Sequence, residues 1–257
     1  MIFNLKARLL FPFPAKATIL LLLSVVFFFA PADALAQRRF SRTYPAASDV
    51  RLELSNRSGF VTVEGWNRPE VSISAYLEAP AATISPQMIA GTIYINVLKD
   101  NQGRAEVGNV NFTVRVPYTS NVDIETLIGN LTVSSVRGGS LRAHISSEGD
   151  ITLTNISAGT VSAQNGIGNI FFDGEIHPGG NYRFASHKGD INLRIPLSSS
   201  FRLVANAPST RSISLGAFAN PNMVLLSDGR RVAGRFGDGS ASVTVTNQRG
   251  GISFLRR

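Results

Sequence analysis

Apolar and polar residues alternate in short segments along the middle of this chain, and each segment begins at a turn residue. One phrase consists of Gly, then Asp or Asn, then an apolar residue, a variable residue and a second apolar residue. It occurs at residues 129–133, 149–153, 168–172 and 189–193. A second phrase interleaves with it at residues 139–143, 159–163 and 180–184. Because strict alternation over a few residues is typical of half-buried strands, every repeat predicts two of them.

The repeat has a nearly constant length. Its corner glycines are Gly129, Gly149, Gly168 and Gly189, at intervals of 20, 19 and 21 residues. A fixed period of this size is the signature of a solenoid. Glycine beside Asn or Asp supplies the positive φ angles that tight corners require. The chain is therefore predicted to be all-β, a β-solenoid (β-helix-like) with coils of about 20 residues and two short strands per coil.

The alternation also predicts which side chains face the interior. One coil cannot bury its apolar side alone, whereas a stack of coils can. The predicted inward positions are Leu141, Ala143, Ile151, Leu153, Val161, Ala163, Ile170, Phe172, Tyr182, Phe184, Ile191, Leu193, Phe201, Leu203, Ile213 and Leu215. An amphipathic helix is excluded, because the period is two and turn residues interrupt every segment.

Residues 37–257 are predicted to form a single domain whose ends differ from its regular coils, 118–215. Within 70–117, three longer alternating segments predict an antiparallel insertion that caps the first end of the stack. These segments are residues 71–77, 92–98 and 109–116. Residues 216–257 are expected to comprise a loop, a hairpin about Asp228-Gly229 and a closing coil.

Residues 1–36 are predicted to be a secretory signal peptide. Basic residues precede an apolar run at 19–30, and Ala34-Leu35-Ala36 forms a small-residue cleavage site that would leave Gln37 first. The run is short for a bilayer span, which favours cleavage over a retained anchor. Residues 37–45 would then be a basic, solvated leader. Export would place the protein in the periplasm, on the cell surface or outside the cell.

Composition narrows the possible chemistry. The formal net charge is +8, and the chain contains no cysteine, which excludes disulfides, thiol catalysts and cysteine metal sites. His144, His177 and His187 occupy three different places in the repeat, so they are not expected to stack into a metal site. The single tryptophan, Trp66, is interpreted as a cap over the first core in preference to a sugar platform. No cofactor is expected.

The repeated phrases resemble those of an adhesin-like domain family of bacterial envelope proteins, a domain of unknown function with repeated Ser-Gly-Asp-Ile phrases. The resemblance rests on the Gly-Asp/Asn units at 129, 149, 168 and 189, on Val116-Pro117, on Ile195-Pro196 and on residues 250–254. It covers nearly all of the chain after the signal peptide. It implies a β-helix-like fold, an exported location and no established catalysis, and it supplies no functional residues.

The first candidate site is the ladder that follows the corner glycines, Asn130, Asp150, Asn169 and Asp190. Asp and Asn directly after Gly ordinarily cap corners by bonding nearby backbone amides, and this interpretation is favoured. Alternatively, Asp150, Asn169 and Asp190 could bind Ca²⁺ through oxygen ligands. Asp150 and Asp190 would lie about 9–10 Å apart, the upper end of the separation in inverting glycosidases, so catalysis on polysaccharide is a third possibility.

The second candidate site is an outward stripe of arginines. Arg142, Arg183 and Arg202 occupy equivalent positions, with Arg183 and Arg202 as expected nearest neighbours. A solvated face is the ordinary interpretation. The stripe could instead hold an anionic surface polymer, a lipid headgroup or an envelope protein. Nucleic acid is disfavoured as a partner because no aromatic residues interleave the arginines.

These features favour an exported, non-enzymatic cell-envelope protein with a structural or adhesion/binding role. One alternative is a β-helix carbohydrate-active enzyme that uses Asp150 and Asp190. Another is a regulatory partner of an envelope stress system, on which the sequence itself is silent. The sequence leaves the oligomeric state open, since edges of the insertion could pair between chains or be blunted by Pro and charge.

Overall fold

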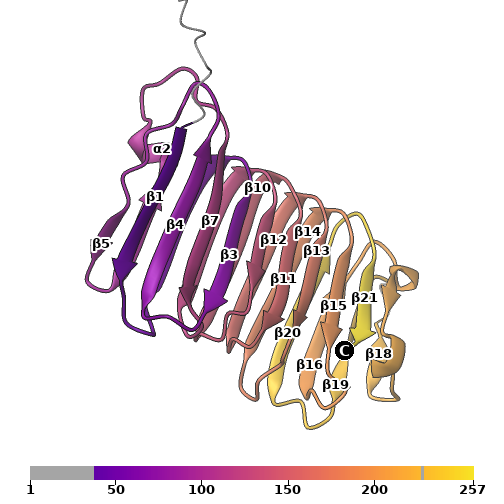
Figure 1. Ribbon diagram of the computed structural model, residues 1–257. Coiled ribbons are helices and arrows are strands. Elements are labelled where there is room, and N and C mark those ends of the chain that lie inside the picture. Colours follow the sequence, from indigo (N-terminus) through magenta and orange to yellow (C-terminus); the bar gives the residue numbers. More distant parts are fainter. Residues whose placement is uncertain (1–37, 227–228) are drawn as a thin grey trace, which may run out of the picture. The chain divides into compact units, whose positions relative to one another are not determined.

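The computed structural model describes residues 38–226 and 229–257, so the predicted signal peptide lies outside the described residues. The described residues form two long β-sheets, and the chain alternates between them (Figure 1). Successive coils contribute one strand to each sheet and stack in parallel, as predicted for an all-β solenoid. None of the helices in this part of the chain is long and apolar enough to cross a membrane.

We call the two sheets sheet A and sheet B and give their strands in spatial order. Sheet A contains β1 (Arg38–Pro45), β4 (Glu70–Leu77), β7 (Val110–Pro117), β3 (Val61–Trp66), β9 (Leu131–Ser134), β11 (Ile151–Ile156), β13 (Ile170–Gly174), β15 (Ile191–Ile195), β21 (Ile252–Arg256) and β17 (Ile213–Ser214). Sheet B contains β18 (Met223–Leu225), β19 (Arg231–Phe236), β16 (Phe201–Asn206), β20 (Ala241–Asn247), β14 (Asn181–Lys188), β12 (Thr160–Ile167), β10 (Ser140–Glu148), β8 (Asn121–Ile128), β2 (Arg51–Ser58), β6 (Thr92–Asn96) and β5 (Gln87–Ile89). The helical elements are α2 (Val97–Asp100), η1 (Thr210–Ser212) and η2 (Gly216–Phe218).

The core lies between the two sheets, where equivalent inward residues stack coil upon coil. Ile151, for example, pairs in register with Leu131 on one side and Ile170 on the other. All the predicted inward residues are buried except Ile213 and Leu215, which are half-buried and pack against the core. The alternation therefore predicted the core because parallel, in-register stacking keeps every coil's inward face aligned.

At the first end of the stack, residues 70–117 contribute to both sheets. β4 pairs antiparallel with β7, which supplies the expected antiparallel insertion, but β6 extends sheet B in parallel with β2. The expected solvated leader is instead the strand β1, antiparallel to β4 along its whole length. The reason is its own alternation, since Phe40 packs against the core and Tyr44 is buried, with its hydroxyl donating to the Pro86 carbonyl at 2.9 Å.

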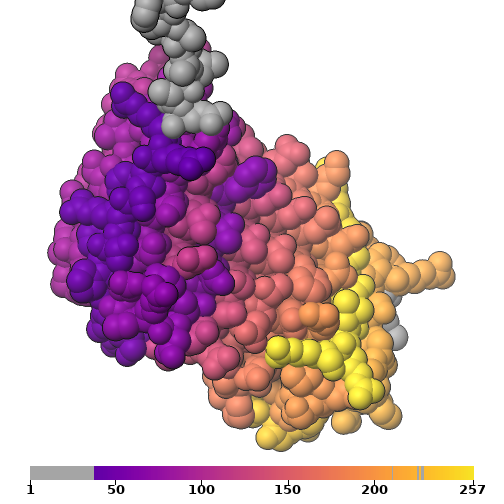
Figure 2. All heavy atoms as spheres, in the orientation of Figure 1, coloured from indigo at the N-terminus to yellow at the C-terminus, as the bar shows by residue number. Residues whose placement is uncertain are grey.

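At the other end, the spatial order of strands departs from the order along the chain. The expected closing coil, β20 and β21, does not lie last in either sheet. β20 lies between β14 and β16, and β21 between β15 and β17. The C-terminal residues, drawn in yellow, consequently lie among orange residues of earlier coils (Figure 2). The expected hairpin is present, with β18 antiparallel to β19 outside β16.

Ile151→Asp will abolish folding or lower the free energy of unfolding by about 4 kcal/mol or more, because it buries an unpaired charge. Ile151 has 0% exposure, whereas its neighbour Thr152 is half-buried on the outer face. Thr152→Asp is the matched control and should change stability by about 1 kcal/mol or less. Chemical denaturation followed by circular dichroism measures both, and equal effects would contradict the inward and outward assignment.

Candidate functional site

The corner glycines form a column along which successive coils approach closely. Gly129, Gly149, Gly168 and Gly189 have φ angles of 118°, 150°, 135° and 132°. A Cβ atom on Gly168 would lie 2.1 Å from the carbonyl oxygen of Gly149, and the corresponding distances at the other three glycines are 2.1–2.2 Å. Only glycine fits such positions, because any side chain would displace the backbone of the preceding coil.

The Asn/Asp ladder beside this column joins each coil to the next. The Oδ1 atom of Asn130 accepts from the Asp150 N–H at 2.9 Å, and Asp150 Oδ1 accepts from the Asn169 N–H at 2.6 Å. Asn169 Oδ1 then accepts from the Asp190 N–H at 2.8 Å. Asp190 Oδ1 completes the series with the Gly251 N–H at 2.7 Å. Asn serves as well as Asp here, because the position needs only an acceptor oxygen.

These bonds favour the structural interpretation of the ladder over a calcium or catalytic site. One oxygen atom of each acidic side chain is already held by the next coil's backbone. Among the described residues, no three His, Cys, Asp or Glu side chains cluster as a metal ion requires. A shallow groove of about 320 Å³ follows this corner, lined by Ile128, Gly129, Asn130, Glu148, Gly149, Asp150, Ile167 and Gly168. Its walls are largely the glycine corner itself.

A second polar column, which the sequence analysis missed, binds the same corner from inside. Asn165 Nδ2 donates to the Gly149 carbonyl at 3.2 Å, and Asn247 Nδ2 donates to the Gly189 carbonyl at 2.7 Å. Ser186 Oγ donates to the Gly168 carbonyl at 3.2 Å. These side chains are buried at inward positions. The sequence contains a signal for this column, because Asn165, Ser186 and Asn247 each lie three positions before a corner glycine.

Within residues 38–226 and 229–257, one serine hydroxyl contacts a histidine ring, but the geometry is not that of a nucleophile and base. Ser157 Oγ lies 2.9 Å from His177 Nε2 and donates to Glu175 Oε2, also at 2.9 Å. In a Ser–His–acid triad the acid holds the imidazole, whereas Glu175 here accepts the hydrogen bond of the serine hydroxyl itself. The His177 N–H donates to the hydroxyl of Tyr182, and burial raises the pKa of that phenol. The cluster therefore fixes the loop after β13.

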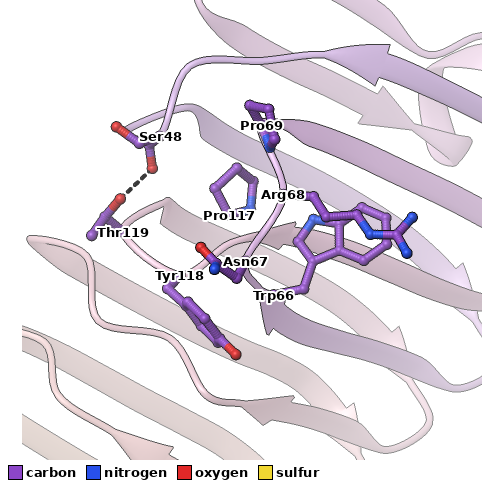
Figure 3. A pocket seen from close by; sticks show the side chains of 8 residues that line it. All are labelled: Ser48, Trp66, Asn67, Arg68, Pro69, Pro117, Tyr118 and Thr119. Carbon is purple, nitrogen blue, oxygen red and sulfur yellow. Dashed lines mark hydrogen bonds between the residues drawn. The ribbon is translucent and has the colours of Figure 1, made fainter.

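A hollow of about 280 Å³ lies at the ends of β3 and β7 (Figure 3). It is lined by Ser48, Trp66, Asn67, Arg68, Pro69, Pro117, Tyr118 and Thr119. Trp66 lies on the same outward face of β3 as Thr62 and Glu64. Its ring therefore does not form the expected cap over the first core. The indole N–H donates to the Glu70 carbonyl at 2.8 Å, and the Arg68 guanidinium lies 4.9 Å from the ring centroid.

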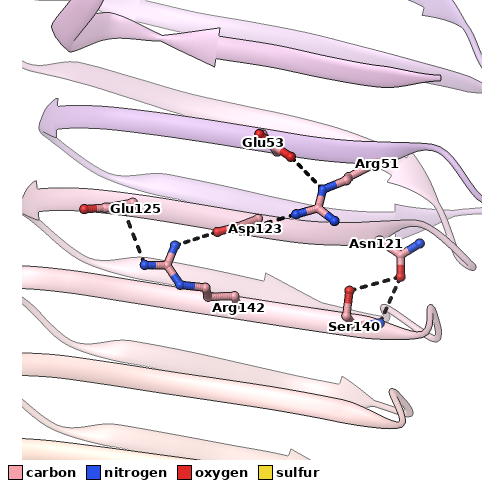
Figure 4. A network of polar contacts seen from close by, with 7 residues as sticks. All are labelled: Arg51, Glu53, Asn121, Asp123, Glu125, Ser140 and Arg142. Carbon is pink, nitrogen blue, oxygen red and sulfur yellow. Dashed lines mark hydrogen bonds and ion pairs between the residues drawn. The ribbon is translucent and has the colours of Figure 1, made fainter. Parts of the chain in front are cut away.

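The predicted arginine stripe divides into two unlike parts. Arg142 is neutralised, since it contacts Asp123 at 2.8 Å and Glu125 at 3.5 Å (Figure 4). The hydrogen bond that Arg142 donates to the Asp123 carboxylate is the main reason that the pKa of Arg142 is raised. Arg51 contacts Asp123 at 3.7 Å and Glu53 at 2.7 Å, which extends the network across β2, β8 and β10. The outer face of this half of sheet B is thus balanced in charge.

Arg183 and Arg202 are not nearest neighbours, which corrects the sequence-based expectation. β20 separates their strands, because the last coil is inserted there. Arg183 pairs with Thr244, whereas Arg202 pairs with Ser242, two residues away along the same strand. From strand spacings, the two backbones lie about 12 Å apart. The repeat period specifies where a residue lies within its coil, but it does not specify which coils are neighbours in the stack.

Arg202 instead lies directly opposite Arg235, on the antiparallel pair of β16 and β19. Both side chains pass Gly239, since a Cβ atom there would lie 2.5 Å from Arg235 Cδ and 3.1 Å from Arg202 Cγ. We call these two residues, with Arg183 and Arg231, the arginine cluster. All four are exposed, and no carboxylate in the described residues lies within 4.0 Å of their nitrogen atoms.

The turn beside the cluster carries one acidic residue, Asp238. Its carboxylate accepts from the Ser240 N–H at 2.9 Å, and this bond is the main cause of its lowered pKa. Asp238 is engaged by its own turn and makes no ion pair with the cluster among the described residues. The C-terminal half of sheet B therefore presents opposed, unpaired positive charge.

The comparisons with known proteins agree with this architecture. A family model, Toastrack DUF4097, matches residues 43–254, nearly all of the described chain. The chain belongs to the Toastrack DUF4097 family. No curated protein matches it. The family is a domain of unknown function, so membership identifies the fold of this Toastrack chain and leaves its ligand to be argued from its own residues.

Several solved structures are similar to the Toastrack chain at low identity. A candidate cell adhesion protein from Clostridium sporogenes is 12% identical, with a TM-score of 0.49, over 86% of this chain and 100% of that one. A candidate adhesin from Bacteroides fragilis is 8% identical, with a TM-score of 0.40, over 86% and 99%. A candidate lipid binding protein from Parabacteroides distasonis is 11% identical, with a TM-score of 0.36, over 85% and 97%.

Gly168→Ala will destabilise the Toastrack domain by about 3 kcal/mol or more, because the new Cβ atom overlaps the Gly149 carbonyl and φ is positive. Gly159→Ala is the matched control. Its Cβ atom would meet only the Gly139 oxygen, at 3.7 Å, so this change should be neutral or stabilise by up to about 1 kcal/mol. Thermal unfolding of both variants measures the difference, and similar midpoints would refute the close approach at the corner.

The thermal midpoint of the Toastrack domain will be the same in EDTA and in excess CaCl₂, because the ladder oxygens of Asp150 and Asp190 are already held by backbone N–H groups. Calcium bound only to the folded state would raise the midpoint. Asp150→Asn keeps the acceptor for the Asn169 N–H and should be nearly neutral. Asp150→Ala removes it and should cost about 1 kcal/mol. A calcium-dependent rise in the midpoint that Asp150→Asn abolishes would restore the metal hypothesis.

Proposed function

We propose that this chain is an exported, non-enzymatic binding module of the cell envelope that attaches to an anionic surface through the arginine cluster of sheet B. The observation that carries this proposal is the contrast along one outer face. Arg142 and its neighbours are balanced by acids, while Arg202 and Arg235 lie opposite each other without one.

The opposed arginines favour a ligand on energetic grounds. Like charges directly opposite on an antiparallel pair destabilise the sheet. Arg202 and Arg235 are brought together by the hairpin that follows β16, and Gly239 leaves room for both side chains. An anionic group between the two guanidinium groups would turn repulsion into charge-assisted hydrogen bonds. Arginine suits this role because its planar fork recognises phosphate and carboxylate oxygens in pairs.

The arrangement suits a surface that displays repeated anionic groups better than one small anion. Arg183 lies about 12 Å from Arg202 across one strand, which allows several headgroups or polymer units to be engaged together. Each basic residue near an anionic membrane contributes about 1 kcal/mol of attraction. The rigid sheet would hold the arginines at fixed spacing, so the structural and binding roles of the module are compatible.

Binding to anionic vesicles will fall about 30-fold in the double variant Arg202→Gln and Arg235→Gln, since two attractive charges are lost. Arg142→Gln is the matched control, because Arg142 is already ion-paired and should matter little. Co-sedimentation of the purified protein with phosphatidylglycerol-containing vesicles measures the loss, with phosphatidylcholine vesicles as the uncharged reference. Binding should weaken as salt is raised.

A parallel titration with dextran sulfate distinguishes a polymer ligand from a lipid headgroup. Equal losses on both materials support recognition of the shared anionic chemistry. The proposal fails if the double variant binds both as well as the parent does, or if Arg142→Gln weakens binding to the same extent.

A further inference from the structure

The hollow lined by Trp66 and Tyr118 is a second candidate site, separate from the arginine cluster. It lies at the ends of β3 and β7, whereas the cluster lies on β14, β16 and β19 near the other end of the strand order. We propose that this hollow binds a uronic acid residue, a sugar ring that bears a carboxylate. The proposal does not depend on the proposed function of sheet B.

The walls of the hollow are mixed in a way that fits a sugar ring. Trp66, Pro69, Pro117 and Tyr118 give it apolar surfaces, and aromatic rings offer broad apolar faces with a polar edge (Figure 3). The side-chain amide of Asn67 and the hydroxyl of Tyr118 make no hydrogen bond to any described residue. A ligand with an apolar face and several hydroxyl groups would match both sets of groups.

Arg68 lines the hollow, and Arg115 and Arg137 lie over the rings of two lining residues, Trp66 and Tyr118. This positive charge calls for an acid on the ligand. Arg68 contacts Glu70 at 3.5 Å, and Arg115 contacts Glu64 at 3.1 Å, so each has a carboxylate partner. Arg137 lies 5.2 Å from the centroid of the Tyr118 ring and has no carboxylate partner among the described residues. A carboxylate on the ligand would supply that partner.

A purely structural role explains only some of these groups. Stacking of Arg68 on Trp66 and the bond from the indole N–H to the Glu70 carbonyl fix the turn after β3. They do not engage Asn67, the Tyr118 hydroxyl or Arg137. The volume of the hollow, about 280 Å³, lies just below the usual range of small-molecule pockets. It suits one sugar ring, with the adjacent sugar units of a polysaccharide outside the hollow.

The protein contains one tryptophan, so its fluorescence reports this hollow directly. The purified protein is titrated with sodium D-glucuronate at constant ionic strength, with D-glucose and sodium acetate as matched controls. We expect a saturable change in tryptophan fluorescence with glucuronate alone. Arg137→Gln should weaken this binding about tenfold or more, because it removes one hydrogen bond to a charged group. Arg202→Gln should leave it unchanged.

Nuclear magnetic resonance of the same titration provides a second readout, through the indole and Asn67 side-chain signals. An equal response to glucose would overturn recognition of the carboxylate, and an equal response to acetate would overturn recognition of the sugar ring. No response in either measurement would overturn the site altogether. Vesicle binding that persists while this titration fails would leave the proposed function of the arginine cluster intact.

Discussion

The close approach of one coil to the next at the glycine corner is the constraint on which the rest of the structure depends. Neighbouring strands lie about 4.8 Å apart, and the carbonyl of each corner glycine occupies the space where a Cβ atom on the next coil's corner glycine would lie. The Asp150 ladder outside and the Asn165 column inside bind this corner from both sides. These contacts hold the coils in register, which is why apolar positions stack on apolar positions throughout the core.

Because the corner and the inward positions maintain the fold, the outward positions are free to differ from coil to coil. The charges on the outer face of sheet B differ between its two halves. Its β2–β8–β10 half pairs Arg142 with Asp123, whereas its β16–β19 half sets Arg202 against Arg235. A regular backbone thus carries an irregular distribution of charge, and the arginine cluster is the part of that distribution that stability alone does not explain.

The fold was largely predictable from the sequence, but the candidate sites were predictable only in part, since the sequence indicated Arg183 and Arg202 but not Arg231 and Arg235. Alternation around Ile151 and Phe172 specifies their face directly, because a shift of one residue would expose them. Nothing in the period indicates that β20 enters between β14 and β16, so the separation of Arg183 from Arg202 could not be foreseen. The opposition of Arg202 and Arg235 depends on the register of β16 with β19, which lies outside the period. The Trp66 hollow was missed for a related reason, since its walls come from distant segments that only the pairing of β3 with β7 brings together.

The most direct test of the central claim is amide hydrogen–deuterium exchange of the protein with and without anionic vesicles. Binding through the arginine cluster predicts slower exchange in β16, β19 and the turn at residues 237–240, with β8 and β10 unchanged in the same sample. Protection of β8 and β10 instead, or no protection on sheet B while the vesicles are bound, would contradict it.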